Sequence, residues 1–167
     1  MNAPAPTALI AEDEPLLAQA LAADLARLWP GLQLLATVGD GLSAATQALA
    51  LKPQVCFFDI RMPGATGLEA AQALAEDWPE GTPFPLLVFV TAYDQYALQA
   101  FEQAAVDYVL KPVQPERLAQ TCARLRAALA QRQAPGGSAG VEAALSQLRE
   151  LLGAPGLGTA STSGPAT

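Results

Sequence analysis

Four short apolar runs, each closed by a polar residue, constrain the fold of this chain more than any other feature. Runs of this length between turn residues are typical of strands buried on both faces of a parallel sheet. The runs are Leu9-Ile10-Ala11, Val55-Cys56-Phe57-Phe58, Leu86-Leu87-Val88-Phe89-Val90 and Tyr108-Val109-Leu110. In one parallel sheet the carboxyl ends of such strands lie along a single edge. We therefore expect the residues that close the runs to converge there: Glu12, Asp13, Asp59, Thr91 and Lys111.

Segments with helical spacing separate the apolar runs. Pro15 to Leu28 repeats apolar residues at helical intervals, and Pro15 suits the first turn of a helix. Further helices are predicted over 42–51, 67–78, 95–104 and 115–132, with one more strand over 32–38. Strands that alternate with helices in this way favour an open α/β sheet, and residues 1–132 hold five such β-α units.

Composition excludes several classes of function. The 167 residues carry a net charge of −7, and the nine lysines and arginines form no basic stripe, so direct binding of nucleic acid is not expected. The sequence contains no histidine, so a phosphohistidine would have to come from a partner. No apolar run approaches the roughly 18 residues that span a membrane. The two cysteines make no disulfide framework, which favours a cytoplasmic protein.

Beyond Arg132 the sequence changes character. Residues 133–167 are rich in alanine, proline, glycine and serine, which is typical of a linker. One amphipathic stretch interrupts them, and we predict a short helix at about 141–152. A folded domain is therefore expected over 1–132 only, followed by a linker.

The residues at the strand ends suit phosphoryl chemistry. Mg²⁺ bridges carboxylate and phosphoryl oxygens and so removes the repulsion between two anions. Asp13 and Asp59 can supply carboxylates, and Glu12 can act through water. A lysine and a hydroxyl, Lys111 and Thr91, can contact phosphoryl oxygens. Each residue alone has a simpler interpretation, such as a solvated loop for the acidic run or a cap for Asp59, but their joint placement favours a functional pocket.

Four segments carry a family resemblance. Leu9–Glu14, Phe58–Gly64, Val90–Ala92 and Tyr108–Pro112 resemble the receiver domain of bacterial response regulators, over residues 7 to about 130. Residues 90–102 look like the LytTR (LytR/AlgR) type in particular. The resemblance implies a flavodoxin-like (βα)5 three-layer sandwich whose parallel five-stranded sheet has the order 2-1-3-4-5. That order makes the first and third strands neighbours at the topological switch point, where such sheets bind ligands.

The resemblance also implies a metal site and a phosphoacceptor. Asp59 would accept a phosphoryl group from the phosphohistidine of a sensor histidine kinase. The metal, Mg²⁺ or Mn²⁺, would be held by Glu12, Asp13 and Asp59 together with the backbone carbonyl of Arg61. The chain is expected to catalyse its own phosphorylation and dephosphorylation, and no other enzyme activity is expected.

The remaining implied roles concern the switch. Thr91 and Lys111 would contact the phosphoryl group, and the Lys111-Pro112 peptide bond would be cis. Tyr108 matches the aromatic residue whose rotamer follows Thr91, although a half-buried strand tyrosine is an alternative interpretation.

The output is expected from protein contacts and a further domain. The resemblance implies a homodimer through the face of the fourth helix, fifth strand and fifth helix, where Tyr96, Leu98 and Phe101 lie. A LytTR-type regulator would control transcription through a C-terminal DNA-binding domain, which is absent from these 167 residues. A stand-alone receiver that acts by protein–protein interaction is the alternative. The sequence leaves open the kinase, the signal, the target genes, the phosphate lifetime, and whether dimerisation depends on phosphorylation.

Two other classes of protein fit less well. An aspartyl-phosphate hydrolase of the haloacid-dehalogenase type needs a second aspartate two residues after its nucleophile, and Arg61 occupies that position. A receiver that works without phosphorylation would usually have lost Asp59 or Lys111, and both are present.

Overall fold

The computed structural model describes residues 5–102 and 104–133. The chain forms two compact units, Met1–Ala123 and Arg124–Thr167. The sheet and all the predicted site residues lie in the first unit, and the described part of the second is the end of the last helix. The predicted linker beyond Gln133, including the helix at 141–152, lies outside the described residues.

Strands and helices alternate along the whole first unit. Their bounds are β1 (Thr7–Ala11), α1 (Pro15–Leu28), β2 (Gln33–Val38), α2 (Gly41–Leu51), β3 (Val55–Phe58), α3 (Gly67–Asp77), β4 (Leu86–Thr91), a 3-10 turn (Asp94–Tyr96), α4 (Ala97–Glu102), β5 (Asp107–Leu110) and α5 (Pro115–Gln133). None of the described helices is long and apolar enough to cross a membrane.

One predicted helix is shorter than expected. The sequence pattern predicts a continuous helix over 95–104, but a 3-10 turn precedes α4, which ends at Glu102. Ala104 has a φ of +62°, in the left-handed region that an α-helix cannot include. The chain therefore leaves the helix before Ala104 and turns toward β5.

The five strands form one parallel sheet in the order β2-β1-β3-β4-β5. This confirms the predicted flavodoxin-like α/β fold. In the register of the sheet Ala11 pairs with Phe58, and Thr91 pairs with Leu110. The residues that follow these pairs therefore leave the sheet at the same edge, as the sequence predicted.

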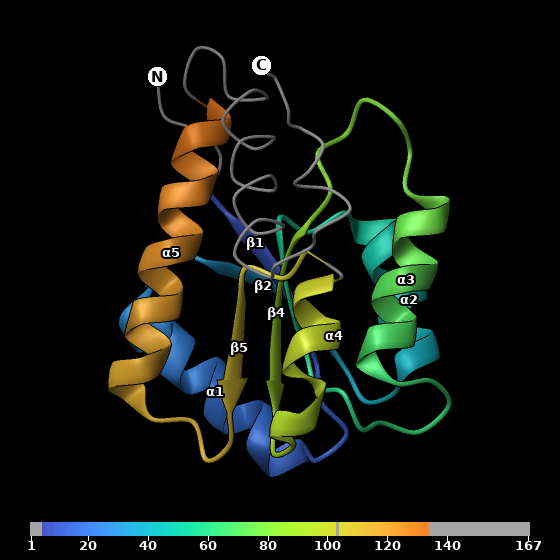
Figure 1. Ribbon diagram of the computed structural model, residues 1–167. Helices are drawn as coiled ribbons and strands as arrows, with labels where there is room; N and C mark the ends of the chain where they lie inside the picture. The colour runs from blue at the N-terminus through green and yellow to red at the C-terminus, as the bar shows by residue number, and fades with distance from the viewer. Residues whose placement is uncertain (1–4, 103, 134–167) are drawn as a thin grey trace, which may run out of the picture. The chain divides into compact units, whose positions relative to one another are not determined.

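The sheet is buried on both faces, which explains the continuous apolar runs. Leu9, Phe58 and Phe89 lie in a core cluster with alanines and leucines of α2 and α3. The neighbouring strand residues, such as Ile10 and Phe57, are also fully buried, and strand alternation directs them to the opposite face. Figure 1 shows α2 and α3 on one side of the sheet and α1 on the other.

Gly67 brings the start of α3 against the backbone that carries Asp59. Its amide donates to the Ile60 carbonyl oxygen at 2.8 Å. A Cβ atom at this position would lie 2.0 Å from the Asp59 carbonyl oxygen. Only glycine permits this approach, because both elements are held by backbone hydrogen bonds.

Gly67→Ala is accordingly expected to destabilise the chain by about 2 kcal/mol, since an added methyl group in a packed region forces the backbone apart. Urea unfolding measures the loss. Gly31→Ala is the matched control, because nothing lies within 4 Å of a Cβ atom at Gly31. Equal unfolding midpoints for the two variants would contradict the close packing described for Gly67.

Candidate functional site

Backbone hydrogen bonds fix the four strand ends relative to one another. The Asp59 amide donates to the Ala11 carbonyl oxygen at 2.9 Å, so β3 ends beside β1. The Lys111 amide donates to the Thr91 carbonyl oxygen at 2.8 Å, which joins the ends of β4 and β5 in the same way. Sheet register thus places the closing residues at one edge of the sheet through backbone hydrogen bonds alone.

Lys111 bridges the two buried carboxylates of the site. Its Nζ lies 2.5 Å from Glu12 Oε1 and 2.9 Å from Asp59 Oδ2. Both carboxylate residues are buried, at 7% and 5% exposure. One ammonium ion therefore compensates two neighbouring carboxylates away from bulk water.

The environment shifts the pKa values of this group. Burial raises the pKa of Glu12, helped by the nearby Asp59 carboxylate, and outweighs the opposing hydrogen bond from Lys111. Burial alone would lower the pKa of Lys111, but its hydrogen bonds to Glu12 and Asp59 outweigh it and raise that pKa. Lys111 thus stays an ammonium ion, and the strand ends keep a cation beside the two buried carboxylates.

The second oxygen of each buried carboxylate is also hydrogen-bonded. Asp59 Oδ1 accepts from the Ile60 amide at 2.7 Å, and Glu12 Oε2 accepts from the Glu14 amide at 3.1 Å. Each carboxylate is therefore bonded at both of its oxygens, to the Lys111 ammonium at one and to a backbone amide at the other. This fixes the orientation of Asp59, with a charged partner on one oxygen and a backbone amide on the other.

A cluster of three carboxylates lies at the end of β1. Oxygen atoms of Glu12, Asp13 and Glu14 all lie within 4.8 Å of one another, and Asp13 and Glu14 are exposed. An all-oxygen donor set of this kind suits Mg²⁺ or Mn²⁺, so the residues fit the expected ion. The resemblance implies Asp59 rather than Glu14 as the third carboxylate. Asp59 is joined to Glu12 through Lys111, and its place among the metal ligands stays a prediction. The run Glu12-Asp13-Glu14 in the sequence could have indicated Glu14 as a further metal ligand.

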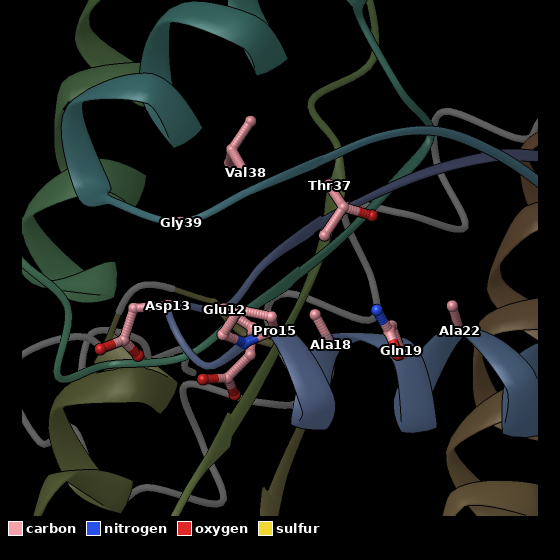
Figure 2. A pocket seen from close by; sticks show the side chains of 9 residues that line it. All are labelled: Glu12, Asp13, Pro15, Ala18, Gln19, Ala22, Thr37, Val38 and Gly39. Atoms are coloured by element: carbon pink, nitrogen blue, oxygen red, sulfur yellow. The ribbon is translucent and has the colours of Figure 1, made fainter.

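A groove runs from the acidic cluster along α1. It encloses about 410 Å³ between the start of α1 and the ends of β1 and β2, and it is lined by Glu12, Asp13, Pro15, Ala18, Gln19, Ala22, Thr37, Val38 and Gly39. Figure 2 shows the two carboxylates at one end of this groove and Gln19 and Ala22 toward the other. Asp13 is exposed, so the groove connects the acidic cluster to solvent.

Thr91 and Tyr108 are connected through Tyr93. Thr91 is fully buried, and its Oγ1 accepts from the Tyr93 amide at 3.4 Å. The Tyr108 hydroxyl donates to the Tyr93 carbonyl oxygen. Thr91 and Tyr108, which the resemblance links in the switch, are therefore hydrogen-bonded to the amide and to the carbonyl oxygen of the same residue, Tyr93.

Arg61 and Pro112 complete the predicted set. The Arg61 guanidinium lies over the Tyr93 ring, with its carbon 4.8 Å from the ring centroid. The peptide bond between Lys111 and Pro112 is cis, as the resemblance implied.

A second buried charge, which the sequence pattern did not indicate, lies at the opposite end of β5 from Lys111. Asp107 is 3% exposed, and Arg117 donates to both of its oxygens at 2.7 and 2.9 Å. The Thr121 hydroxyl donates to the same carboxylate at 2.7 Å. Burial opposes ionisation of Asp107, but these hydrogen bonds, with one from the Tyr108 amide, lower its pKa. Arg117 and Thr121 thus tie the first two turns of α5 to β5, the strand that Lys111 follows.

A five-stranded parallel sheet with two buried carboxylates bridged by a lysine at its switch point is the architecture of a signalling receiver. The chain belongs to the response regulator receiver domain family, whose model matches residues 8–123.

Curated relatives support the same family. An uncharacterized response regulatory protein of Vibrio cholerae is 44% identical over 129 residues, which are 77% of this chain and 48% of that protein. The transcriptional regulatory protein BtsR of Escherichia coli is 39% identical over 118 residues, which are 71% of this chain and 47% of that protein. The chain thus spans about half the length of these curated relatives.

Solved structures share the fold over nearly their full length. The response regulatory domain of protein mrkE from Klebsiella pneumoniae has a TM-score of 0.68 at 30% identity, covering 75% of this chain and 98% of that one. The REC domain of AraT from Geobacillus stearothermophilus has a TM-score of 0.70 at 29% identity, covering 78% and 99%. The described sheet is therefore that of a receiver domain.

Proposed function

We propose that this chain is a phosphorylation-activated switch of a two-component system and that Asp59 is its phosphoacceptor. The observation that carries the proposal is the Lys111 ammonium, bonded at once to Asp59 and to Glu12 at the carboxyl edge of the sheet. It leaves an oriented carboxylate beside a fixed cation and an acidic cluster, which is the combination that phosphoryl transfer to a carboxylate requires.

In the proposed reaction a carboxylate oxygen of Asp59 attacks the phosphorus atom of a phosphohistidine on a partner kinase. The bond between phosphorus and the imidazole nitrogen breaks, the nitrogen keeps the electron pair, and Asp59 becomes an acyl phosphate. The chain contains no histidine of its own, so the donor acts in trans. The protein is a phosphoacceptor with self-phosphorylation and autodephosphorylation rather than an enzyme with a separate substrate.

Glu12 and Asp13, with Asp59 and the Arg61 carbonyl oxygen, would hold Mg²⁺ or Mn²⁺. The ion, when bound, screens the negative charge between the acceptor carboxylate and the incoming phosphoryl group. Glu14 belongs to the same acidic cluster, and its exposure suits a contact through water.

Lys111 and Thr91 respond to the new phosphoryl group in this proposal. A phosphoryl group adds a charge of about −1.5 to −2 and several strong acceptors. Lys111 already touches the acceptor carboxylate, so it can pair with a phosphoryl oxygen after a small shift. The Thr91 hydroxyl can donate to another oxygen and draw the loop after β4 inward, which Tyr108 follows.

The proposed effects of phosphorylation, dimerisation and control of transcription, involve surfaces and residues outside the phosphorylation site. We propose a cytoplasmic dimer that forms through the face of α4, β5 and α5, and transcriptional control through a LytTR DNA-binding domain outside these residues. Two facts support a regulator of transcription: BtsR is named a transcriptional regulatory protein, and this chain matches about half of it. A stand-alone receiver that acts on protein partners remains the alternative, and neither version requires this chain to bind nucleic acid or a membrane itself.

The proposal is tested by incubating the purified chain with acetyl phosphate and Mg²⁺. Intact-mass spectrometry is expected to find one added phosphoryl group per chain, and EDTA is expected to suppress it. An unchanged mass under conditions that phosphorylate a known receiver would overturn the proposed function.

A further inference from the structure

The loop between β3 and α3 is held at two points by the first residues of two helices. The Gly67 amide, at the start of α3, donates to the Ile60 carbonyl oxygen at 2.8 Å. The Gly41 amide, at the start of α2, donates to the Pro63 carbonyl oxygen at 3.1 Å. Arg61, whose carbonyl oxygen belongs to the predicted metal site, lies between these two held residues. The position of that oxygen therefore depends on α2 as well as on α3.

Gly41 also packs directly against the backbone of this loop. A Cβ atom at Gly41 would lie 2.1 Å from the carbonyl oxygen of Ala65 and 2.6 Å from its carbonyl carbon. The next residue of α2, Leu42, lies against the loop at Gly64, where a Cβ atom would be 3.5 Å from Leu42 Cγ. The φ of Gly41 is not in the left-handed region, so backbone conformation alone does not require glycine there. The close approach of α2 to the loop is therefore what excludes a side chain at this position.

The first turn of α2 is itself fixed by a cap. Asp40 precedes the helix, and its carboxylate accepts from the Ser43 amide at 2.7 Å and from the Ser43 hydroxyl at 2.9 Å. Further along the helix, Ala44 and Ala48 are fully buried in the core cluster beside the sheet. Because its first turn is capped and its inner face is buried, α2 is a fixed support for the loop.

We propose that Gly41 is a positioning residue, which seats the loop after β3 on α2 and so places the Arg61 carbonyl oxygen for the metal ion. The inference rests on the proposed function, in which that oxygen is one of the ligands of Mg²⁺ or Mn²⁺. A side chain at Gly41 would push Ala65 away and move the segment between Ile60 and Pro63. Groups that orient a metal ligand typically change the metal affinity by about tenfold or more when they are lost.

Gly41→Ala is expected to weaken the binding of Mg²⁺ to the full chain about tenfold, as measured by isothermal titration calorimetry. Hydrogen exchange of residues 64–67, measured without metal, is expected to become faster because the loop loses its seat. Ala48→Val is the matched control, since it adds bulk at a fully buried position about two turns further along α2. Both variants are expected to lower the midpoint of urea unfolding, but only Gly41→Ala is expected to change the affinity for Mg²⁺. Equal affinity in Gly41→Ala and the unmodified chain would overturn the inference.

Two substitutions of Asp40 test the same seat without added bulk, and they decide the inference if Gly41→Ala does not fold. Asp40→Ala removes the cap, whereas Asp40→Asn removes the same charge but keeps an acceptor for the Ser43 amide. Asp40→Ala is expected to bind Mg²⁺ more weakly than Asp40→Asn and to speed the exchange of residues 64–67, and equal values in the two variants would then contradict the inference.

Failure of the inference can be told apart from failure of the proposed function. If the unmodified chain binds no Mg²⁺, the metal site of the proposed function fails. Hydrogen exchange alone then decides the positioning role, and unchanged exchange of residues 64–67 in Gly41→Ala refutes it.

Discussion

Replacing Asp59 with asparagine is expected to change a stoichiometric phosphoryl adduct, formed with acetyl phosphate and Mg²⁺, to none. The amide is neutral, so it is a far weaker nucleophile toward phosphorus than a carboxylate. The variant should still fold, because the amide oxygen can accept the hydrogen bond from the Ile60 amide and Lys111 keeps its ion pair with Glu12. Intact-mass spectrometry measures the adduct, and circular dichroism checks the fold.

The matched control for this change is Asp77→Asn. Asp77 is an exposed carboxylate at the end of α3, so the substitution makes the same chemical change away from the strand ends. It is expected to leave the adduct at the level of the unmodified chain. An adduct on the Asp59→Asn protein as large as that on the control would mean that another group accepts the phosphoryl, and Asp59 would lose its proposed role.

The fold could be predicted because local pattern and global topology agree. Each buried strand appears as an uninterrupted apolar run, and each run ends at a residue that sheet register then places at one edge. Asp59 lies beside β1 because its amide pairs with Ala11, which follows from strand order alone. The convergence of Glu12, Asp59, Thr91 and Lys111 thus needed no knowledge of side-chain packing.

Contacts that depend on side-chain conformation could not be predicted in this way. Lys111 contacts both Glu12 and Asp59, and this arrangement depends on the conformation of a flexible side chain between two buried carboxylates. The Arg61–Tyr93 contact depends on two loops whose geometry the sequence pattern does not specify. The end of α4 was missed for a similar reason, because Ala104 adopts a left-handed conformation that alanine does not usually favour.

Arg117→Ala is expected to lower the free energy of unfolding by about 2–3 kcal/mol near neutral pH, the cost of removing charged hydrogen bonds from a buried carboxylate. Arg117 donates to both oxygens of Asp107, and the Thr121 hydroxyl and the Tyr108 amide, both neutral, also donate to that carboxylate. The expected loss is at the low end for a buried ion pair, because the Arg117 side chain is 35% exposed. Urea unfolding measures the difference.

The pH dependence of this loss distinguishes an ion pair from simple packing. The pKa of Asp107 is lower in the folded chain than its ordinary value of 3.8, so ionisation contributes stability that is present above that value. As the pH falls through the lowered pKa, the folded carboxylate takes up a proton and the contribution disappears. The difference between Arg117→Ala and the unmodified chain should therefore shrink below about pH 4.

Arg27→Ala provides the comparison, because Arg27 also pairs with an aspartate, Asp24, but on the exposed face of α1. Its loss is expected to cost no more than about 0.5 kcal/mol, since water and salt already screen an exposed pair. If Arg117→Ala cost as little as this control at neutral pH, Asp107 would not depend on Arg117. A large cost that did not vary between pH 3 and pH 7 would instead assign the effect to packing of the arginine side chain. Comparing the two variants thus distinguishes a buried ion pair that holds the start of α5 against β5 from an exposed ion pair within one helix.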